Sequence, residues 1–390
     1  MVRYLLVAAM LLSAALSGCA QQSDVFPDLG ENISSPTSMW IDVASDRLYL
    51  VNSNDKVLYD STQGSFQVYD ITDPLAPVLL GTAPTLSFTG QVYFDPATLL
   101  AWAPNRYSAN VNVKTGLLYK FDVNEAGAGF LSFTESEIQT DSYGMECCYP
   151  AGRVWITSSW QDGNNPVYQY VDLGGDLTPG EMPLSTTLDG GSQLNTAQAT
   201  YEVLAGPQAF LSRYYGGIMV INLDKAGVAD SVPMDYFIND IEQPRGLAHD
   251  GTYLYVAGEG ADEDGDWIPF LLILDVSTLV PRAGNTTTME LDKEGDDLLV
   301  AMIQVGNYPQ EVLVTSDYAF VTNQNDNTVS VISIAGRNVV TTIDVGQQPV
   351  TMSLYTTLAG EEKYVYVGNM YDNTISIIDI PTLEVVATYP

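Results

Sequence analysis

The sequence predicts an all-β fold built from repeated units of about four short strands each. In many short segments apolar and polar residues alternate with a period of two, which is typical of strands that bury one face. After residue 20 we find no long segment with the 3.6-residue period of an amphipathic helix. Similar segments recur at intervals of about 40–60 residues, and a period of that length indicates a repeat architecture.

Two copies of a hairpin show the repeat most clearly. Residues 319–334 read AFVTNQNDNTVSVISI, and residues 366–380 read YVGNMYDNTISIIDI. In each copy an apolar run is followed by an Asp-Asn turn and a second alternating run. Because Asn and Asp tolerate φ > 0, this pattern predicts a tight β-hairpin. Residues 49–71 contain a looser copy with a longer turn.

Matching the second strand of each unit divides the rest of the chain into seven units. Their approximate ranges are 36–85, 86–138, 139–190, 191–240, 241–304, 305–346 and 347–390. Four of them open on a residue followed by proline: Ser35-Pro36, Gln243-Pro244, Tyr308-Pro309 and Gln348-Pro349. The strand spacing alone also suits a β-sandwich. The period and the repeated starts favour a seven-bladed β-propeller with four antiparallel strands per blade, in which each sheet covers its neighbours.

The two clear hairpin copies resemble the YVTN repeats of bacterial seven-bladed propellers. Residues 66–81, FQVYDITDPLAPVLLG, resemble the related LVIVD repeat of exported bacterial propellers. The resemblance spans residues 36–390; it is strong in units six and seven, fair in unit one and weak in the others. It implies the fold but no particular activity, because propellers serve as scaffolds, binding proteins and enzymes alike.

The N-terminal residues predict an export signal followed by a lipid anchor. Arg3 precedes an apolar run, Tyr4 to Leu16, that is too short to span a bilayer comfortably. The sequence Leu-Ser-Gly-Cys at residues 16–19 resembles the bacterial lipobox. This resemblance implies a signal peptide at residues 1–18 and a lipidated Cys19. The alternative is an ordinary signal peptide with an incidental cysteine.

The rest of the domain organisation follows from composition. Residues 19–35 are polar and contain Gly and Pro, so we interpret them as a tether to the propeller at residues 36–390. Ala20 follows the cysteine, and by the sorting rule of diderm bacteria this favours the outer membrane. The last apolar run, residues 383–389, is predicted to be the outer strand of unit seven, so that the tether need not lend a strand.

The charge balance limits the choice of partner. The chain has 14 Lys and Arg against 48 Asp and Glu, a net charge of −34. Such a surface repels phosphate backbones and anionic lipids, so nucleic acid is excluded, and the membrane is contacted only through the lipid anchor. We interpret the acidity as a solvated surface adapted to saline surroundings, with a cationic partner as the alternative. A protein or glycan of the envelope or the exterior remains the expected partner.

Cys147 and Cys148 are adjacent, and once Cys19 is lipidated they are the two cysteines that remain. In an oxidising compartment such cysteines tend to pair, so a vicinal disulfide is predicted at the start of the inner strand of unit three. It would shape a ligand pocket or act as a redox latch. The alternatives are a purely structural turn and two buried thiols.

The acidic segment GADEDGDW contains Asp262, Asp264 and Asp266. Alternating carboxylates supply the hard oxygen ligands that Ca²⁺ prefers. The segment lacks the glycine and the distal glutamate of an EF-hand, so an acidic solvated loop is the alternative. A calcium ion is the one cofactor that we predict.

The turns between second and third strands and the links into first strands are expected to share one face. Exposed aromatic and arginine side chains on one rim are typical of recognition surfaces. The residues predicted on this binding face are Arg106, Trp160, Arg213, Tyr214, Arg245, Glu259, Trp267 and Tyr371. Glu146 and Glu311 are expected at the mouth of the central channel. Asn52, Asn323 and Asn369 recur at the ends of second strands, and we predict that they stabilise turns.

Residues suited to acid–base or nucleophilic catalysis are scarce. His249 is the only histidine, which excludes a His-rich copper centre and argues against a zinc hydrolase. The chain has no nucleophile-elbow sequence and no phosphate-binding glycine loop. We therefore predict no catalytic residues.

The function that we predict is a monomeric, lipid-anchored binding or scaffold module at the cell envelope. It would recognise a protein, peptide or glycan through one rim face. The alternative is a lactonase-like hydrolase or lyase with an acidic metal site in the channel, which three or more converging carboxylates would support. A structural component of an envelope assembly is the third hypothesis.

Overall fold

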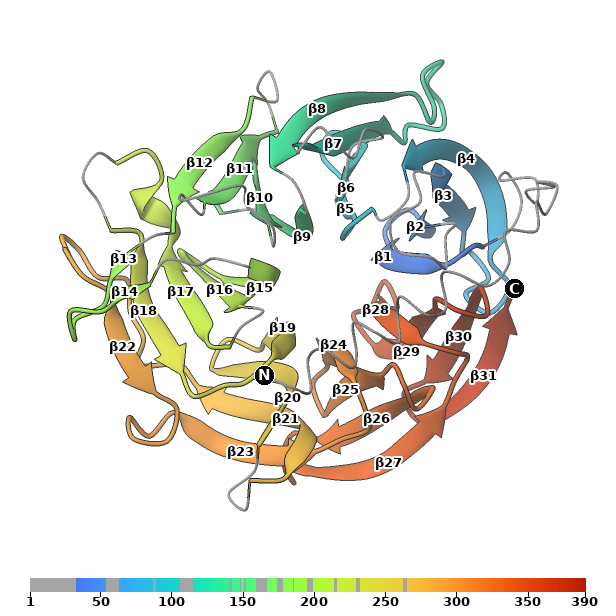
Figure 1. Cartoon of the computed structure of the whole chain (residues 1–390). Coiled ribbons are helices and arrows are strands. Elements are labelled where there is room, and N and C mark those ends of the chain that lie inside the picture. Colours follow the sequence, from blue (N-terminus) through green and yellow to red (C-terminus); the bar gives the residue numbers. More distant parts are fainter. Residues whose placement is uncertain are drawn as a thin grey trace, which may run out of the picture. The chain divides into compact units, whose positions relative to one another are not determined.

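Seven β-sheets surround a common axis in the computed structural model (Figure 1). The residues that the structure describes are 33–53, 63–86, 89–105, 115–139, 142–147, 149–150, 152–158, 167–173, 178–184, 186–194, 199–213, 216–228, 232–261 and 265–390. The predicted signal peptide, Cys19 and most of the tether fall on residues 1–32, outside the described residues. Within the described segments, no helix has the length and apolarity needed to cross a membrane.

Each sheet, or blade, pairs four strands antiparallel in chain order from the axis to the rim. The innermost strands are β1 (Pro36–Asp42), β5 (Tyr93–Asp95), β9 (Ser142–Cys147), β15 (Ala199–Ala205), β19 (Pro244–His249), β24 (Pro309–Val314) and β28 (Pro349–Thr356). The second strands are β2 (Arg47–Asn52), β6 (Leu100–Asn105), β10 (Arg153–Ser158), β16 (Gln208–Arg213), β20 (Tyr253–Ala261), β25 (Tyr318–Asn323) and β29 (Glu362–Asn369). The third strands are β3 (Gln63–Asp70), β7 (Thr115–Asp122), β11 (Val167–Asp172), β17 (Ile218–Asn222), β21 (Trp267–Asp275), β26 (Thr328–Ser333) and β30 (Thr374–Asp379). The outer strands are β4 (Val78–Leu86), β8 (Phe133–Gln139), β12 (Gly180–Pro183), β18 (Met234–Asn239), β23 (Leu299–Gln304), β27 (Asn338–Asp344) and β31 (Glu384–Tyr389). The predicted seven-bladed β-propeller is confirmed.

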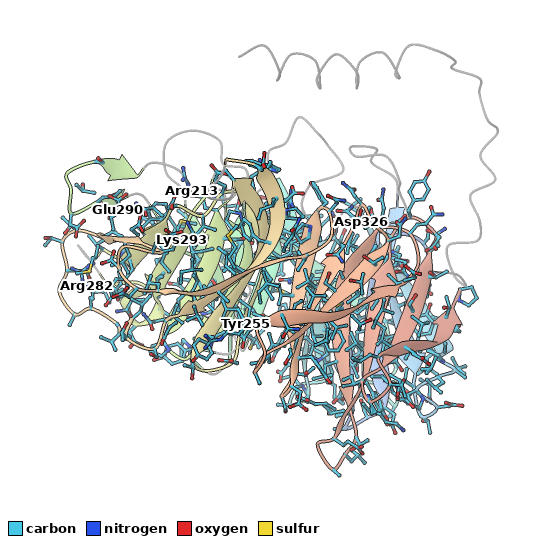
Figure 2. All side chains as sticks on the ribbon, turned by 90° about the horizontal axis from the view of Figure 1, so that it is seen from below. Arg213, Tyr255, Arg282, Glu290, Lys293 and Asp326 are labelled. Carbon is cyan, nitrogen blue, oxygen red and sulfur yellow. The ribbon has the colours of Figure 1, made fainter. Side chains whose placement is uncertain are left out.

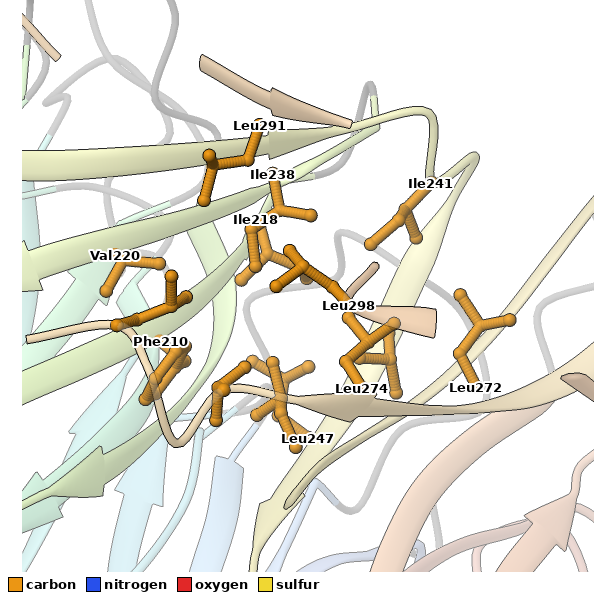
Figure 3. Close-up of a cluster of buried hydrophobic side chains, with 14 of the residues drawn as sticks. Phe210, Ile218, Val220, Ile238, Ile241, Leu247, Leu272, Leu274, Leu291 and Leu298 are labelled. Carbon is orange, nitrogen blue, oxygen red and sulfur yellow. The ribbon is translucent and has the colours of Figure 1, made fainter. Parts of the chain in front are cut away.

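Neighbouring blades bury their apolar side chains against one another. Between blades 4 and 5, Phe210 and Ile218 from blade 4 meet Leu247 and Leu272 from blade 5 (Figure 3). Second and third strands are buried almost throughout because each lies between two neighbouring sheets, whereas outer strands alternate between buried and exposed residues. Burial of one such side chain stabilises the fold by about 1.5–3 kcal/mol.

The ring closes between the first and last blades without a shared strand. The predicted strand at residues 383–389 is β31, the outer strand of blade 7, so this prediction is confirmed. Strand β1 packs beside β28. The backbone N–H of Ser35 donates to Oδ1 of Asn373 in the β29–β30 turn, at 2.9 Å.

The recurring asparagines at the ends of second strands stabilise the turns, as predicted. Asn323 is fully buried; its Oδ1 accepts the N–H of Gly306, and its Nδ2 donates to the hydroxyls of Thr328 and Ser330. A Cβ on Gly306 would lie 2.6 Å from Cγ of Asn323, so this position requires glycine. The asparagine therefore ties the link that enters blade 6 to the third strand of that blade. Blade 7 repeats the close contact between its asparagine and a glycine.

Blade 4 departs from the four-strand pattern because a segment from blade 5 adds a fifth strand to it. Residues 276–298, between β21 and β23, leave blade 5; we call this segment the strap. It contains β22 (Met289–Asp292), which pairs parallel with β18 and makes blade 4 a five-stranded sheet. A small hairpin, β13 (Thr186–Thr187) and β14 (Gln193–Leu194), bridges to the strap through Leu188 and Thr288. The added strand covers a sheet edge that would otherwise be unpaired.

A buried carboxylate holds the strap against blade 4. Asp235 in β18 has no exposed surface and forms an ion pair with Lys225 at 2.7 Å, in the short 3₁₀ turn η2 (Leu223–Lys225). Its other carboxyl oxygen accepts the backbone N–H of Arg282 at 2.6 Å, and the Arg282 guanidinium donates to the Asp235 carbonyl. Figure 2 labels Arg282, Glu290 and Lys293 along the strap. No sequence pattern predicts this network.

Candidate binding face and axial carboxylates

In each blade the first strand starts at the edge where the second strand ends. The register pairs Pro309 with Asn323 in blade 6, and blades 1 and 7 repeat this pairing. The turns between second and third strands therefore share one face with the links into first strands, which we call the link face. Figure 2 shows Arg213, at the end of β16, and Asp326, in the β25–β26 turn, on the same side of the ring.

Three residues from blades 5 and 6 form a cluster on the link face. The guanidinium of Arg245 in β19 contacts Oε2 of Glu259 in β20 at 2.9 Å. The same guanidinium lies over the ring of Tyr308, 3.7 Å from its centroid. Oε1 of Glu259 accepts the backbone N–H of Tyr308 at 3.1 Å. Glu259 thus orients the arginine and joins two blades.

Tyr308 has a backbone conformation that a bulky residue rarely adopts. Its φ is 57°, and the residues before the opening proline in blades 1, 5 and 7 also have positive φ. Besides the bond to Glu259, its carbonyl accepts the N–H of Gln324 at 3.0 Å. Strain of this kind persists where the surroundings hold it, and it is common at binding sites. From the sequence Tyr308 is noted only as a repeat start, although a tyrosine where the other three proline-opened units have Ser or Gln is a detectable signal.

Exposed aromatic side chains gather on the link face of three consecutive blades. Trp267 at the start of β21 is 54% exposed, Tyr308 is 37% exposed, and Tyr371 in the β29–β30 turn is 47% exposed. We call these three residues the aromatic arc. Large aromatic surfaces are normally buried, so their grouping on one face is typical of a recognition surface.

Among the other predicted binding-face residues, the structure describes Arg213, which does not extend the arc. Arg213 donates to the carbonyl of Gly216 and lies 5.9 Å from the ring centroid of Phe237, so it packs on its own blade. Arg106, Trp160 and Tyr214 lie outside the described residues.

The predicted disulfide and calcium sites lie only partly within the described residues. Cys147 is disulfide-bonded, while Cys148 lies outside. Asp266 is exposed, and Asp262 and Asp264 lie outside. Among the residues that the structure describes, no three Asp, Glu, His or Cys side chains are grouped so that they could hold a metal ion.

His249 has a structural environment. Its Nδ1 accepts the N–H of Gly251 at 3.0 Å, and its ring stacks on Phe210 with the centroids 5.7 Å apart. Burial lowers the pKa of His249 more than the neighbouring Asp250 raises it. The imidazole therefore stabilises a turn.

In blades 1 and 6 the third residue, counted from the opening proline, ties the inner strand to the next blade. Oγ of Ser38 in blade 1 accepts the N–H of Val92 in blade 2 at 2.9 Å. In the same way Oε2 of Glu311 in blade 6 accepts the N–H of Met352 in blade 7 at 3.0 Å. Burial raises the pKa of Glu311 to about 8 despite this bond and the hydroxyl of Thr351, both of which favour the charged form.

The raised pKa of Glu311 predicts a stability that falls as pH rises. Between about pH 5 and pH 8 the folded protein retains a proton that the unfolded chain, with a carboxyl pKa of 4.5, releases. We expect Glu311→Gln to make the decline in the free energy of unfolding shallower by up to about 1.4 kcal/mol per pH unit. Urea denaturation at a series of pH values measures it. Glu384→Gln removes an exposed carboxyl as the control, and equal slopes in the two variants would contradict the prediction.

Two further glutamates face each other across the interface between blades 3 and 4. Positions along the inner strands are counted from the residue that pairs with the second strand nearest the link face; in blade 2 this is Thr89, an isolated bridge before β5. These residues are Pro36, Thr89, Ser142, Ala199, Pro244, Pro309 and Pro349. Counted from these, Glu146 is fifth in its strand and Glu202 is fourth. Fourth-position side chains point to the preceding blade, as Leu247 does, and fifth-position side chains point to the following blade, as Leu313 does. Glu146 and Glu202 therefore converge.

The two carboxyl groups have different access to solvent. Glu202 is 3% exposed, and neither of its oxygens has a hydrogen-bond partner among the described residues. Glu146 is half-buried. Burial raises the pKa of Glu146 to about 7. Burial also raises the pKa of Glu202, and the charge of Glu146 adds to that shift, while the nearby N–H of Thr157 opposes it.

Sequence similarity between repeats would misplace Glu202, which is not among the residues predicted from the sequence. Residues 202–204 and 311–313 both read Glu-Val-Leu, which aligns Glu202 with Glu311. The register instead places Glu202 where blade 6 has Val312, and one residue moves a side chain to the other face of a sheet. Glu311 lies at the interface of blades 6 and 7, so the convergence of three carboxylates that would support an enzyme is not seen among the described residues.

The comparisons with known proteins define the class of protein by its fold. No protein-family model matches the chain, and no curated protein matches it. In structure the chain is similar to Kuenenia stuttgartiensis hydrazine synthase, with a TM-score of 0.62 and 11% identity over 93% of this chain and 99% of that one. It is also similar to the β-propeller domain of Myceliophteria thermophila Cps50 (Swd1), with a TM-score of 0.61 and 11% identity over 89% and 98% of the two chains. The computationally designed Ika8 protein gives a TM-score of 0.53 and 13% identity over 92% and 88%. At these identities the likeness shows the seven-bladed fold alone.

Proposed function

We propose that this propeller is a binding or scaffold module that recognises a protein, peptide or glycan through the link face of blades 5–7. The observation that carries the proposal is the aromatic arc, Trp267, Tyr308 and Tyr371, beside the Arg245–Glu259 pair. Aromatic and arginine side chains supply most of the binding energy in recognition surfaces. Arg245 is already oriented by Glu259, so little ordering is required when a partner binds.

The cellular setting that we propose follows from the N-terminal sequence. The lipobox-like residues 16–19 support attachment through a lipidated Cys19, and Ala20 supports the outer membrane. Membership of the YVTN/LVIVD-repeat propellers is likewise a proposal, supported by the repeats in blades 1, 6 and 7. Several lipid chains would hold the domain firmly at a membrane surface and bring its face close to other envelope components.

The combined variant Trp267→Ser, Tyr308→Gln and Tyr371→Ser tests the binding face. Glutamine stands before the opening proline in blades 5 and 7, so blade 6 should accept it. We expect at least a tenfold loss in the partner that wild type captures by crosslinking in intact envelopes, because hot-spot aromatic residues contribute about 2 kcal/mol or more each. Quantitative mass spectrometry of the captured proteins and glycans measures the loss.

Leu358→Ser is the matched control. Leu358 is 81% exposed in the turn between β28 and β29, on the opposite face of the ring. The control should capture the same partner as wild type. Equal capture by the link-face variant, or equal loss in the control, would rule out this face as the binding site.

A further inference from the structure

One inter-blade interface differs in chemistry from the other six. Six of the seven fourth-position residues of the inner strands are apolar and at least nine-tenths buried: Met39, Val92, Met145, Leu247, Val312 and Met352. In blade 4 this position is Glu202, and it is as deeply buried as the apolar residues. The residue that faces it from blade 3 is Glu146, whereas the corresponding residue of blade 2 is the aromatic Tyr93. Two carboxyl groups thus lie at an inter-blade interface where the other blades pack apolar side chains.

This arrangement is costly unless another group neutralises it. Burying a carboxylate without a partner costs several kcal/mol, and a second carboxylate in front of it adds repulsion. Glu202 lacks the kind of partner that Glu311 has: neither of its carboxyl oxygens makes a hydrogen bond to a described residue, whereas Oε2 of Glu311 accepts the N–H of Met352. The nearby backbone N–H of Thr157 lowers the pKa of Glu202 and so favours its charged form.

We propose that Glu146 and Glu202 form a binding site for a divalent cation between blades 3 and 4. Two carboxylates supply hard oxygen ligands and neutralise a charge of +2, which suits Ca²⁺ or Mg²⁺, with water completing the coordination shell. Glu146 is half-buried and offers the ion a path from solvent. The bound ion would join blade 3 to blade 4. The site is separate from the acidic segment at residues 262–266.

The test is thermal unfolding of the propeller in EDTA and in increasing CaCl₂ at pH 8. Ionic strength is held constant with NaCl, because screening of the −34 charge would itself raise Tm. We expect Ca²⁺ at about 100 times its Kd to raise Tm by about 2–4 °C in wild type. Glu202→Gln and Glu146→Gln should lose this rise. Both variants should be at least as stable as wild type in EDTA, because each removes the repulsion.

Two control variants separate this site from other causes. Glu311→Gln removes an inner-strand carboxyl that has its own partners, and Asp264→Ala removes one carboxylate of the calcium segment predicted at residues 262–266. Glu311→Gln should keep the whole rise, and Asp264→Ala should keep the part of it that Glu202→Gln removes. A rise in Glu202→Gln as large as that in wild type would overturn the proposal and assign the ion elsewhere. The proposal would also be overturned if Ca²⁺ and Mg²⁺ left the Tm unchanged while acidification raised it in wild type and not in Glu202→Gln. That result would show that the two glutamates share a proton.

Discussion

Asp235→Ala is expected to lower the free energy of unfolding by about 3–5 kcal/mol. The substitution removes the partner of Lys225, which is itself largely buried, and leaves its charge uncompensated. It also removes the acceptor for the backbone N–H of Arg282 in the strap. Urea denaturation followed by intrinsic fluorescence measures the loss, and hydrogen exchange of residues 276–298 should show that the strap loses protection first.

Two further variants make this result specific. Asp235→Asn keeps the shape and an acceptor oxygen but not the charge, so most of the loss should remain. Asp240→Asn removes the charge from the ion pair with Lys293, in which Asp240 is 62% exposed, and keeps a residue type that tolerates the φ of 58° at this position, so it should cost less than about 1 kcal/mol. If Asp235→Asn and Asp240→Asn cost the same, the buried pair does not hold the strap.

Asn323→Ala should destabilise the propeller by about 2–4 kcal/mol. The side chain makes three hydrogen bonds from a fully buried position, and its removal leaves the N–H of Gly306 and the hydroxyl of Ser330 without this partner. The cost should be seen as a lower urea midpoint in equilibrium unfolding.

Asn325→Ala, in the same turn but exposed, is the matched control. Its side chain can be removed without opening a buried space, so the change should stay within about 0.5 kcal/mol. A similar midpoint for both variants would mean that the asparagine recurs only because the repeats have similar sequences, and that the fold does not require it.

The fold could be predicted because its determinants are local and repeated. An Asp-Asn turn between two alternating runs specifies a hairpin by itself, and its recurrence at 319–334 and 366–380 specifies the blade. The strap could not be predicted in this way. It occurs once, and β22 pairs with β18 about fifty residues earlier in the chain, so no repeat or turn signal marks the partnership.

The candidate site could be predicted where it depends on strand ends alone. Arg245, Glu259, Trp267 and Tyr371 were assigned to one face because strand ends and turns alternate regularly between the two faces of a propeller. The Glu146–Glu202 pair depends instead on register. A single residue of offset decides which blade a side chain faces, and blades 4 and 6, which share the letters Glu-Val-Leu, differ by that one residue.

The joint between blades 1 and 7 has a mechanical consequence. Every other neighbouring pair of blades is connected by the polypeptide, whereas this pair is held by side-chain packing and by contacts such as that of Ser35 with Asn373. Mechanical force or heating should therefore separate blades 1 and 7 first, because only non-covalent contacts have to break at this seam. A circular permutant, in which a peptide linker joins blade 7 to blade 1 and the chain is opened at another inter-blade link, would move the weakest point of the molecule without changing any sheet.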